Sequence, residues 1–131
     1  MMEHKYIFSI VMAVYNCELF LRETLDSVIE QDISSFVYND ENGQPTDKRI
    51  PFEKIVQLIM VDDGSTDGSG AICDEYSAKY PNFKVIHKEN GGVASARNEG
   101  LKYVEGKYMN FLDSDDKFSS NVFEFVFKFF E

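Results

Sequence analysis

The feature that most constrains the fold is a repeated alternation of short apolar runs with segments of helical periodicity. Uninterrupted apolar runs of this length are typical of strands that are buried on both faces. A chain that alternates strands with helices folds into a largely parallel sheet, with right-handed crossovers and helices on both faces. The sequence therefore predicts an α/β fold. The expected strands are Ile7–Val14, Ile55–Val61, Phe83–His87 and Tyr108–Leu112.

Three helices are expected between these strands, because apolar side chains recur there at helical spacing. The first is capped by Asn16 and ends near Gln31, and Ser or Asn side chains are common in that capping role. The third ends before Gly106, which is a suitable residue for a left-handed stop. The second helix covers Ser69–Tyr80 and the third covers Val93–Val104.

A long insertion interrupts the alternation between about residues 32 and 54. The stretch Asn39–Gly43 and the nearby Pro45 are turn-forming residues. Connections of this length are uncommon inside a compact domain and are usually functional or mobile. We expect a solvated loop that adds to the fold without belonging to its core.

The chain is acidic, with 13 basic and 23 acidic residues among 131, giving 13 − 23 = −10. This balance excludes a nucleic-acid binder, because phosphate contacts need Lys and Arg. The length predicts one domain, and Cys17 and Cys73 are too few for a disulfide framework. We expect a cytoplasmic chain, with peripheral attachment at the inner face of the membrane as the alternative.

Acidic clusters follow the second and fourth expected strands. Asp62 and Asp63 end one strand, and Asp113, Asp115 and Asp116 end the other. Ligands of parallel α/β sheets bind beyond the carboxyl ends of the strands, so the two clusters should meet there. The Asp113–Ser114–Asp115 spacing suits Mn²⁺ or Mg²⁺ held together with substrate phosphates. A polar turn with capping side chains is the alternative reading.

Other patterns leave further alternatives open. Asn90–Gly91–Gly92 before a helix resembles a turn that binds phosphate, and Arg97 could reach an anion from that helix. The residues from Asp63 to Asp74 partly match a calcium loop, but a strand rather than a helix precedes them. His4 and His87 have no partner at metal-ligand spacing, so we expect both to be structural.

Taken together, the motifs at the strand ends resemble the inverting family 2 glycosyltransferases of the GT-A (Rossmann-like) fold. The resemblance spans nearly the whole chain, except for the insertion and the C-terminal tail. The matching stretches are Ser9–Asn16, Val61–Asp67, Asn90–Asn98 and Phe111–Asp116.

The resemblance implies a function and a set of roles. The function is metal-dependent transfer of a sugar from a nucleoside-diphosphate donor, expected to be UDP-linked, to an acceptor hydroxyl in glycan or cell-envelope polymer synthesis. Asp115 would be the direct metal ligand, with Asp113 facing the ribose and the metal. The residues expected to bind the rest of the donor are Ala13 and Tyr15 at the base, Asp63 supported by Asp62, and Arg97 in the pocket wall.

The segment from Ser119 to Glu131 is apolar on nearly every side and rich in Phe. We therefore expect residues 1–131 to be the donor-binding portion of a longer domain, truncated before its acceptor half and general base. A homo-oligomer formed through this segment is the other expectation. Two alternatives to a complete transferase remain: an isolated nucleotide-binding module without turnover, and a nucleotidyltransferase, which usually carries a Gly-rich, Arg-bearing loop where this chain has Ala13–Asn16.

Overall fold

A four-stranded parallel sheet forms the centre of the computed structural model, which describes residues 4–114. Its order is β5-β4-β1-β6. The predicted α/β class with a parallel sheet is therefore confirmed. The strands are β1 (Tyr6–Val14), β4 (Val56–Asp63), β5 (Phe83–Lys88) and β6 (Gly106–Phe111).

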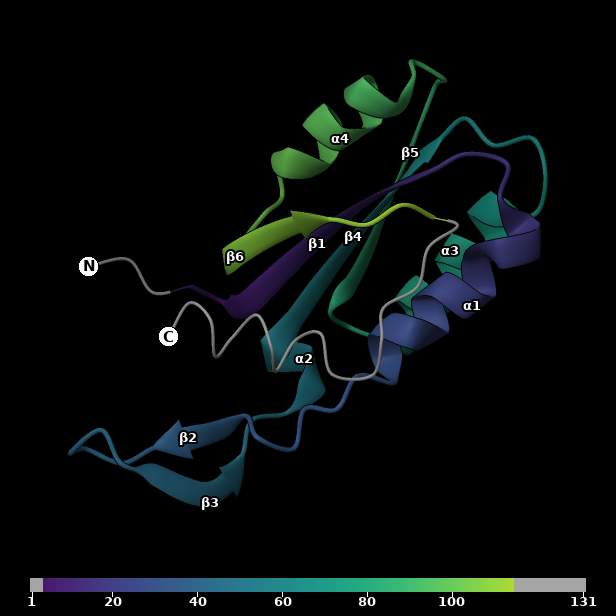
Figure 1. Ribbon diagram of the computed structural model, residues 1–131. Helices are drawn as coiled ribbons and strands as arrows, with labels where there is room; N and C mark the ends of the chain where they lie inside the picture. The colour runs from purple at the N-terminus through teal and green to yellow at the C-terminus, as the bar shows by residue number, and fades with distance from the viewer. Residues whose placement is uncertain (1–3, 115–131) are drawn as a thin grey trace.

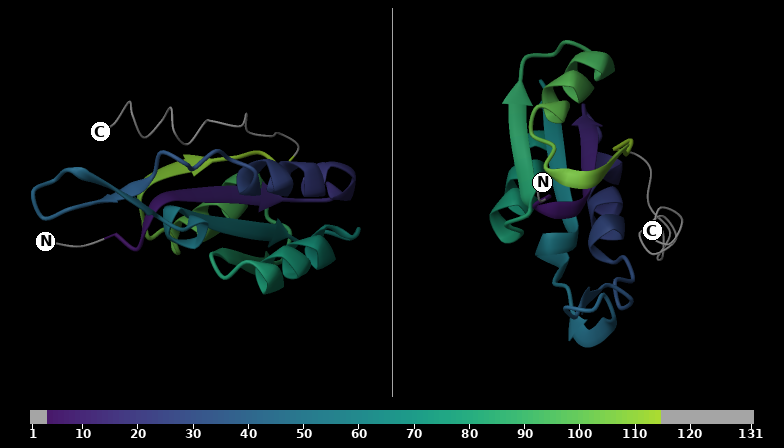
Figure 2. Two further views of the ribbon diagram at one scale, coloured as in Figure 1. Left: turned by 90° about the horizontal axis from the view of Figure 1, so that it is seen from below. Right: turned by 90° about the vertical axis from the view of Figure 1, so that its left-hand side faces the viewer.

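Helices cover both faces of this sheet, as Figures 1 and 2 show. Helices α1 (Glu18–Ile29) and α3 (Ser69–Lys79) lie together on one face, where the Tyr76 hydroxyl donates to Asp26 Oδ1 at 2.7 Å. Helix α4 (Val93–Leu101) lies on the other face. The sheet is thus the middle of three layers.

The two central strands carry the core because both of their faces are buried. Alternate side chains of a strand point to opposite faces. Ile10, Met12 and Val14 pack in the larger cluster with α1 and α3, while Val11 packs with Ala96 of α4. This explains why β1 and β4 read as continuous apolar runs instead of alternating ones.

The order of the strands creates a crevice at one end of the sheet. Strand β4 lies next to β1, and β5 lies next to β4. After β5 the chain passes through α4 to β6, which pairs with β1 on its other side. The direction of winding therefore reverses between β1 and β6. The carboxyl ends of strands at such a reversal are where α/β sheets bind ligands.

The insertion is folded, so the expectation of a loop was wrong. It forms a two-stranded antiparallel hairpin, β2 (Val37–Asn39) and β3 (Pro45–Arg49), followed by the short helix α2 (Phe52–Ile55). Phe36 anchors the hairpin in the core, 6.1 Å from the Phe8 ring between centroids. The hairpin extends from the end of the sheet at which β1 and β4 begin (Figure 1).

Two local predictions were also wrong. Cys17, not Asn16, precedes the first residue of α1, because Asn16 adopts a φ of 47° and turns its side chain toward another loop. Gly106 begins β6 instead of ending a helix in the left-handed region. A Cβ at Gly106 would lie 2.6 Å from Ser9 Oγ, so close strand packing explains the glycine.

Among residues 4–114, no helix is both long and apolar enough to cross a membrane.

Candidate functional site

A pocket of about 590 Å³ opens at the carboxyl end of the sheet, at the β1/β6 crevice. Its wall combines the β1–α1 loop, the end of β4, the β5–α4 loop and the residues after β6. Segments separated by about a hundred residues therefore meet there, as the acidic clusters predicted. The lining residues are Ala13, Tyr15, Asn16, Cys17, Phe20, Asp63, Asn90, Gly92, Val93, Asp113 and Ser114.

The β1 side of the pocket is largely apolar. Ala13 belongs to the end of β1, and Tyr15 follows the strand with half of its surface exposed. Phe20, in the first turn of α1, is 53% exposed and also lines the pocket. Exposed aromatic rings at the rim of a pocket offer flat apolar faces for a planar ring.

Asp63 is the buried carboxylate of the pocket, and its two oxygens are held by three donors. Oδ1 accepts from Lys88 Nζ at 2.8 Å and from the Gly91 N–H at 2.9 Å, and Oδ2 accepts from the Gly92 N–H at 2.9 Å. Burial alone would raise the pKa of Asp63, but these donors outweigh it and hold the pKa below its ordinary value. The carboxylate is therefore ionised at neutral pH.

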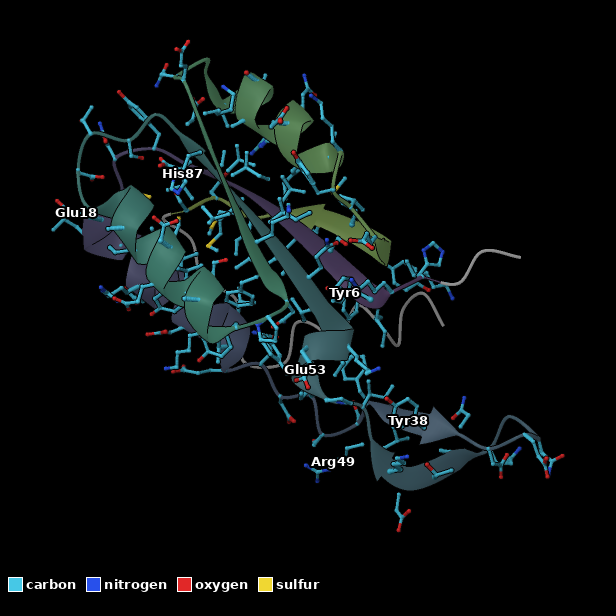
Figure 3. The ribbon with its side chains drawn as sticks, turned by 180° about the vertical axis from the view of Figure 1, so that it is seen from behind. Tyr6, Glu18, Tyr38, Arg49, Glu53 and His87 are labelled. Atoms are coloured by element: carbon cyan, nitrogen blue, oxygen red, sulfur yellow. The ribbon has the colours of Figure 1, made fainter. Side chains whose placement is uncertain are left out.

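Asp62 faces away from the pocket and contacts His87. Its Oδ2 lies 2.7 Å from His87 Nδ1, and its Oδ1 accepts from the Ser65 N–H at 3.0 Å. His87 Nε2 lies 2.7 Å from Asp74 Oδ1 on α3. Hydrogen bonds that His87 donates to Asp74 and then to Asp62 raise the pKa of His87, and burial opposes this rise. His87, labelled in Figure 3, thus links α3, β4 and β5, in keeping with its expected structural role.

Asp113 and Arg97 form an ion pair at the edge of the pocket. Arg97 Nη2 lies 3.1 Å from Asp113 Oδ1, and the guanidinium stacks 4.9 Å from the Phe111 ring centroid. Asp113 lines the pocket, whereas Arg97 is not among the lining residues. The structure therefore places Arg97 behind Asp113, and an anion would have to draw it away from this partner. Asp115 and Asp116 lie outside the described residues.

Two carboxylates, Asp63 and Asp113, line the part of the pocket where a metal ion is expected. No group of three or more His, Cys, Asp or Glu side chains within residues 4–114 is arranged to hold a cation. Both oxygens of Asp63 already accept hydrogen bonds, while the Asp113 side chain is 58% exposed. Asp113 is thus the more accessible of the two carboxylates, but its Oδ1 accepts from Arg97 Nη2 at 3.1 Å, so a divalent cation would have to bind through Oδ2 or displace Arg97. Its expected partner Asp115 lies outside the described residues.

The loops after β1 and β4 are tied together by hydrogen bonds. Asn16 Oδ1 accepts from the Thr66 N–H at 2.7 Å and the Asp67 N–H at 3.3 Å. Glu18 Oε2 accepts from the Gly68 N–H at 3.0 Å, and Asp67 Oδ2 accepts in return from the Glu18 N–H at 3.3 Å. Backbone amides thus use the carboxylate of Asp67, and β4 precedes this loop, so the geometry disfavours the calcium loop.

Some residues of the site were missed by sequence reasoning. Lys88 ends β5 beside Asp63, and Phe20 lines the pocket. A signal for Lys88 was present, because it directly follows the third expected strand, Phe83–His87, at the same edge as the acidic pair. Phe20 carried no such signal, because exposed and buried aromatic side chains look alike in the first turn of a helix.

The sequence profile of Glycosyl transferase family 2 matches residues 9–131. Among curated proteins, the chain is 48% identical over 127 residues to the minor teichoic acid biosynthesis protein GgaB of Bacillus subtilis (strain 168), covering 96% of this chain and 12% of that protein. It is 39% identical over 127 residues to the minor teichoic acid biosynthesis protein GgaA of the same strain, covering 95% of this chain and 25% of that protein. The chain thus spans a small part of the length of these relatives.

The fold matches solved structures as well. Crystal structures of S. aureus TarS 1-349 in complex with UDP and in complex with UDP-GlcNAc each align with a TM-score of 0.74 at 30% sequence identity. Both alignments cover 94% of this chain, and they cover 31% and 30% of the two TarS chains. The parallel sheet and its flanking helices are therefore shared with these proteins.

Proposed function

Because the chain belongs to glycosyl transferase family 2, we propose that residues 1–131 form the nucleotide-sugar-binding portion of a glycosyltransferase domain. The acceptor site and the general base would then lie in further parts of a longer protein. This proposal agrees with the small share of GgaB and GgaA that the chain covers.

The observation that carries the proposal is the composition of the pocket at the β1/β6 crevice. It places aromatic and apolar side chains on one side, the ionised Asp63 within it and the exposed Asp113 at its edge. A nucleotide sugar has matching parts: a planar base, a ribose and a diphosphate. Tyr15 and Ala13 would contact the base, Asp63 would accept from a base N–H or a ribose hydroxyl, and Asp113 would face the ribose and the metal side of the diphosphate.

A uracil base is the expected partner of this pocket. TarS, which shares the fold at 30% identity, has been crystallised with UDP and with UDP-GlcNAc. The names of GgaB and GgaA refer to minor teichoic acid biosynthesis. We therefore propose a UDP-sugar donor and an acceptor hydroxyl on a cell-envelope polymer.

The proposed reaction displaces the diphosphate from the anomeric carbon of the sugar, with inversion. The acceptor hydroxyl forms the new bond to that carbon and loses its proton to a base outside the described residues. A divalent cation, Mn²⁺ or Mg²⁺, bound through Asp113 and Asp115, would neutralise charge on the departing diphosphate. This also answers how a chain of net charge −10 binds an anion.

Calorimetric titration of UDP, GDP, CDP and dTDP, with Mn²⁺ and then with a chelator, tests the proposal. We expect UDP to bind most tightly and chelation to weaken it, because the diphosphate and the carboxylates repel each other without a cation. Failure of all four nucleotides to bind the folded chain would contradict the proposed donor site.

Two substitutions test which carboxylates bind the metal ion. Asp115→Asn and Asp113→Asn should each reduce Mn²⁺-dependent UDP affinity by about tenfold or more, because each removes a charged oxygen ligand. Asp47→Asn is a matched control, because Asp47 is an exposed acid on the hairpin strand β3. An Asp115→Asn chain that binds UDP and Mn²⁺ as tightly as the parent would exclude Asp115 as the metal ligand.

A further inference from the structure

Lys88 is a basic side chain at the end of β5 that is directed at the pocket carboxylate. Its Nζ donates to Asp63 Oδ1 at 2.8 Å and to the Glu89 carbonyl at 2.7 Å. The Lys88 side chain is 22% exposed and that of Asp63 is 4% exposed. The ion pair is therefore largely shielded from water, which makes it stronger than a surface pair.

A direct role for Lys88 as a phosphate ligand does not fit this geometry. An ammonium group has three protons, and two of them are already directed at Asp63 and at the Glu89 carbonyl. Lys88 is also not among the residues that line the pocket, whereas Asp63 is. Any effect of Lys88 on a bound nucleotide must therefore pass through Asp63 and the adjoining loop.

The loop after β5 is built around the same carboxylate. The Gly91 and Gly92 N–H groups both donate to Asp63 at 2.9 Å. At Gly91 a Cβ would lie 3.0 Å from Lys88 Nζ and 2.8 Å from Ser95 Oγ. The ammonium, the two amides and the carboxylate thus form one closely packed unit, and a shift of one member would move the others.

From these contacts we propose that Lys88 is a positioning residue, which holds Asp63 in the orientation that receives the nucleoside end of the donor. The role presupposes that the pocket binds a nucleotide, as proposed above. Without Lys88, Asp63 would keep two amide donors but lose its compensating charge. The carboxylate would then be less fixed in direction where it meets the nucleoside.

The test compares Lys88→Met with the parent, using uridine and UDP as separate probes of affinity in the full chain. Lys88→Met removes the charge and keeps most of the length of the side chain, and Lys88→Arg restores the charge. Lys84→Met is the matched control, because Lys84 lies on the same strand but stacks on Tyr103, 4.8 Å from the ring centroid. NMR titration of the ¹³C-labelled Asp63 carboxyl in the unliganded chain gives a readout that needs no ligand.

We expect Lys88→Met to weaken uridine and UDP by the same factor, about tenfold, because the loss acts through the nucleoside contact. The pKa of Asp63 should rise in Lys88→Met and return toward the parent value in Lys88→Arg, while Lys84→Met changes neither property. Equal affinities in Lys88→Met and the parent would overturn the inference, as would an unchanged Asp63 pKa or a loss confined to UDP. A parent chain that binds neither probe would instead show that the proposed function itself is wrong.

Discussion

Asp62 and Asp63 are neighbours in β4, so their side chains leave the strand toward opposite faces. Asp62 meets His87 on the face covered by α3, and Asp63 meets Lys88 and the loop before α4. The sequence could predict that this pair ends a strand beside the site. The contacts of each carboxylate could not be predicted, because they depend on which helix covers which face.

At the scale of single residues, Gly64 should be the glycine of the pocket loops at which an added side chain destabilises the fold most. Its φ is +76°, and a Cβ would lie 2.7 Å from the Asn90 backbone nitrogen. We expect Gly64→Ala to lower the free energy of unfolding by at least about 2 kcal/mol, since it adds a clash to the backbone strain of an L-residue. Chemical denaturation of the variant and the parent measures this difference.

Gly43 provides the control for that substitution. Its φ of +78° is nearly the same, but no atom lies within 4 Å of the position of a Cβ. Gly43→Ala should therefore cost only the backbone strain, about 1 kcal/mol. Equal losses in the two variants would mean that the contact with Asn90 contributes nothing to the effect.

At the scale of elements, His87 should make the packing of α3 on the sheet depend on pH. An imidazole donates to both Asp62 and Asp74 only when both of its nitrogens carry protons. Because its pKa is raised in the folded chain, its contribution is complete below the unfolded pKa of about 6.5 and is lost as pH rises through the folded pKa.

We expect the parent to be more stable than His87→Gln by up to about 1 kcal/mol near pH 6, a value kept small because the side chain is 47% exposed. The difference should shrink as the pH rises through the raised pKa of His87 in the folded chain. Thermal unfolding of both chains across this range measures it. A difference that grows with pH would show that the neutral imidazole makes the stabilising contact.

The predictability of the elements depended on how much apolar surface each one buries. Strands β1 and β4 were predicted within a few residues, because burial on both faces leaves continuous apolar runs. Strands β5 and β6 are more exposed, and they were predicted from shorter apolar stretches that alternate with the helical segments. Strands β2 and β3 were missed, because both are short and mostly exposed, so they show no alternation. Their hairpin is held instead by turn contacts, such as the Asn42 and Gln44 N–H groups that donate to Asp40 Oδ1 at 2.9 Å.

At the scale of the whole molecule, the hairpin and the pocket lie at opposite ends of the sheet. Figure 3 shows Tyr38 and Arg49 of the hairpin far from His87, which lies at the carboxyl end. The resemblance alone left open whether the insertion shapes the donor site. No residue of the insertion is among those that line the pocket, so the insertion makes no part of the described pocket wall.

Shortening the hairpin should therefore leave nucleotide binding unchanged. We expect replacement of residues 40–44 by a two-residue Asn-Gly turn to preserve UDP affinity within about twofold, because no lining residue is touched. Calorimetry under the conditions used for the parent checks this. A larger loss would show that the hairpin and the pocket are coupled.

The position of β6 beside β1 has a consequence for the order of folding. Strand β1 pairs with β6 through residues such as Phe8 and Tyr108, which are far apart in the chain, whereas β4 and β5 are closer neighbours. Closing a long loop costs more chain entropy than closing a short one. As the chain is synthesised, three strands can assemble before β6 exists. The wall that carries Asp113 would then be added after the walls formed by β1, β4 and β5, so that the pocket would gain nucleotide affinity only once β6 has paired with β1.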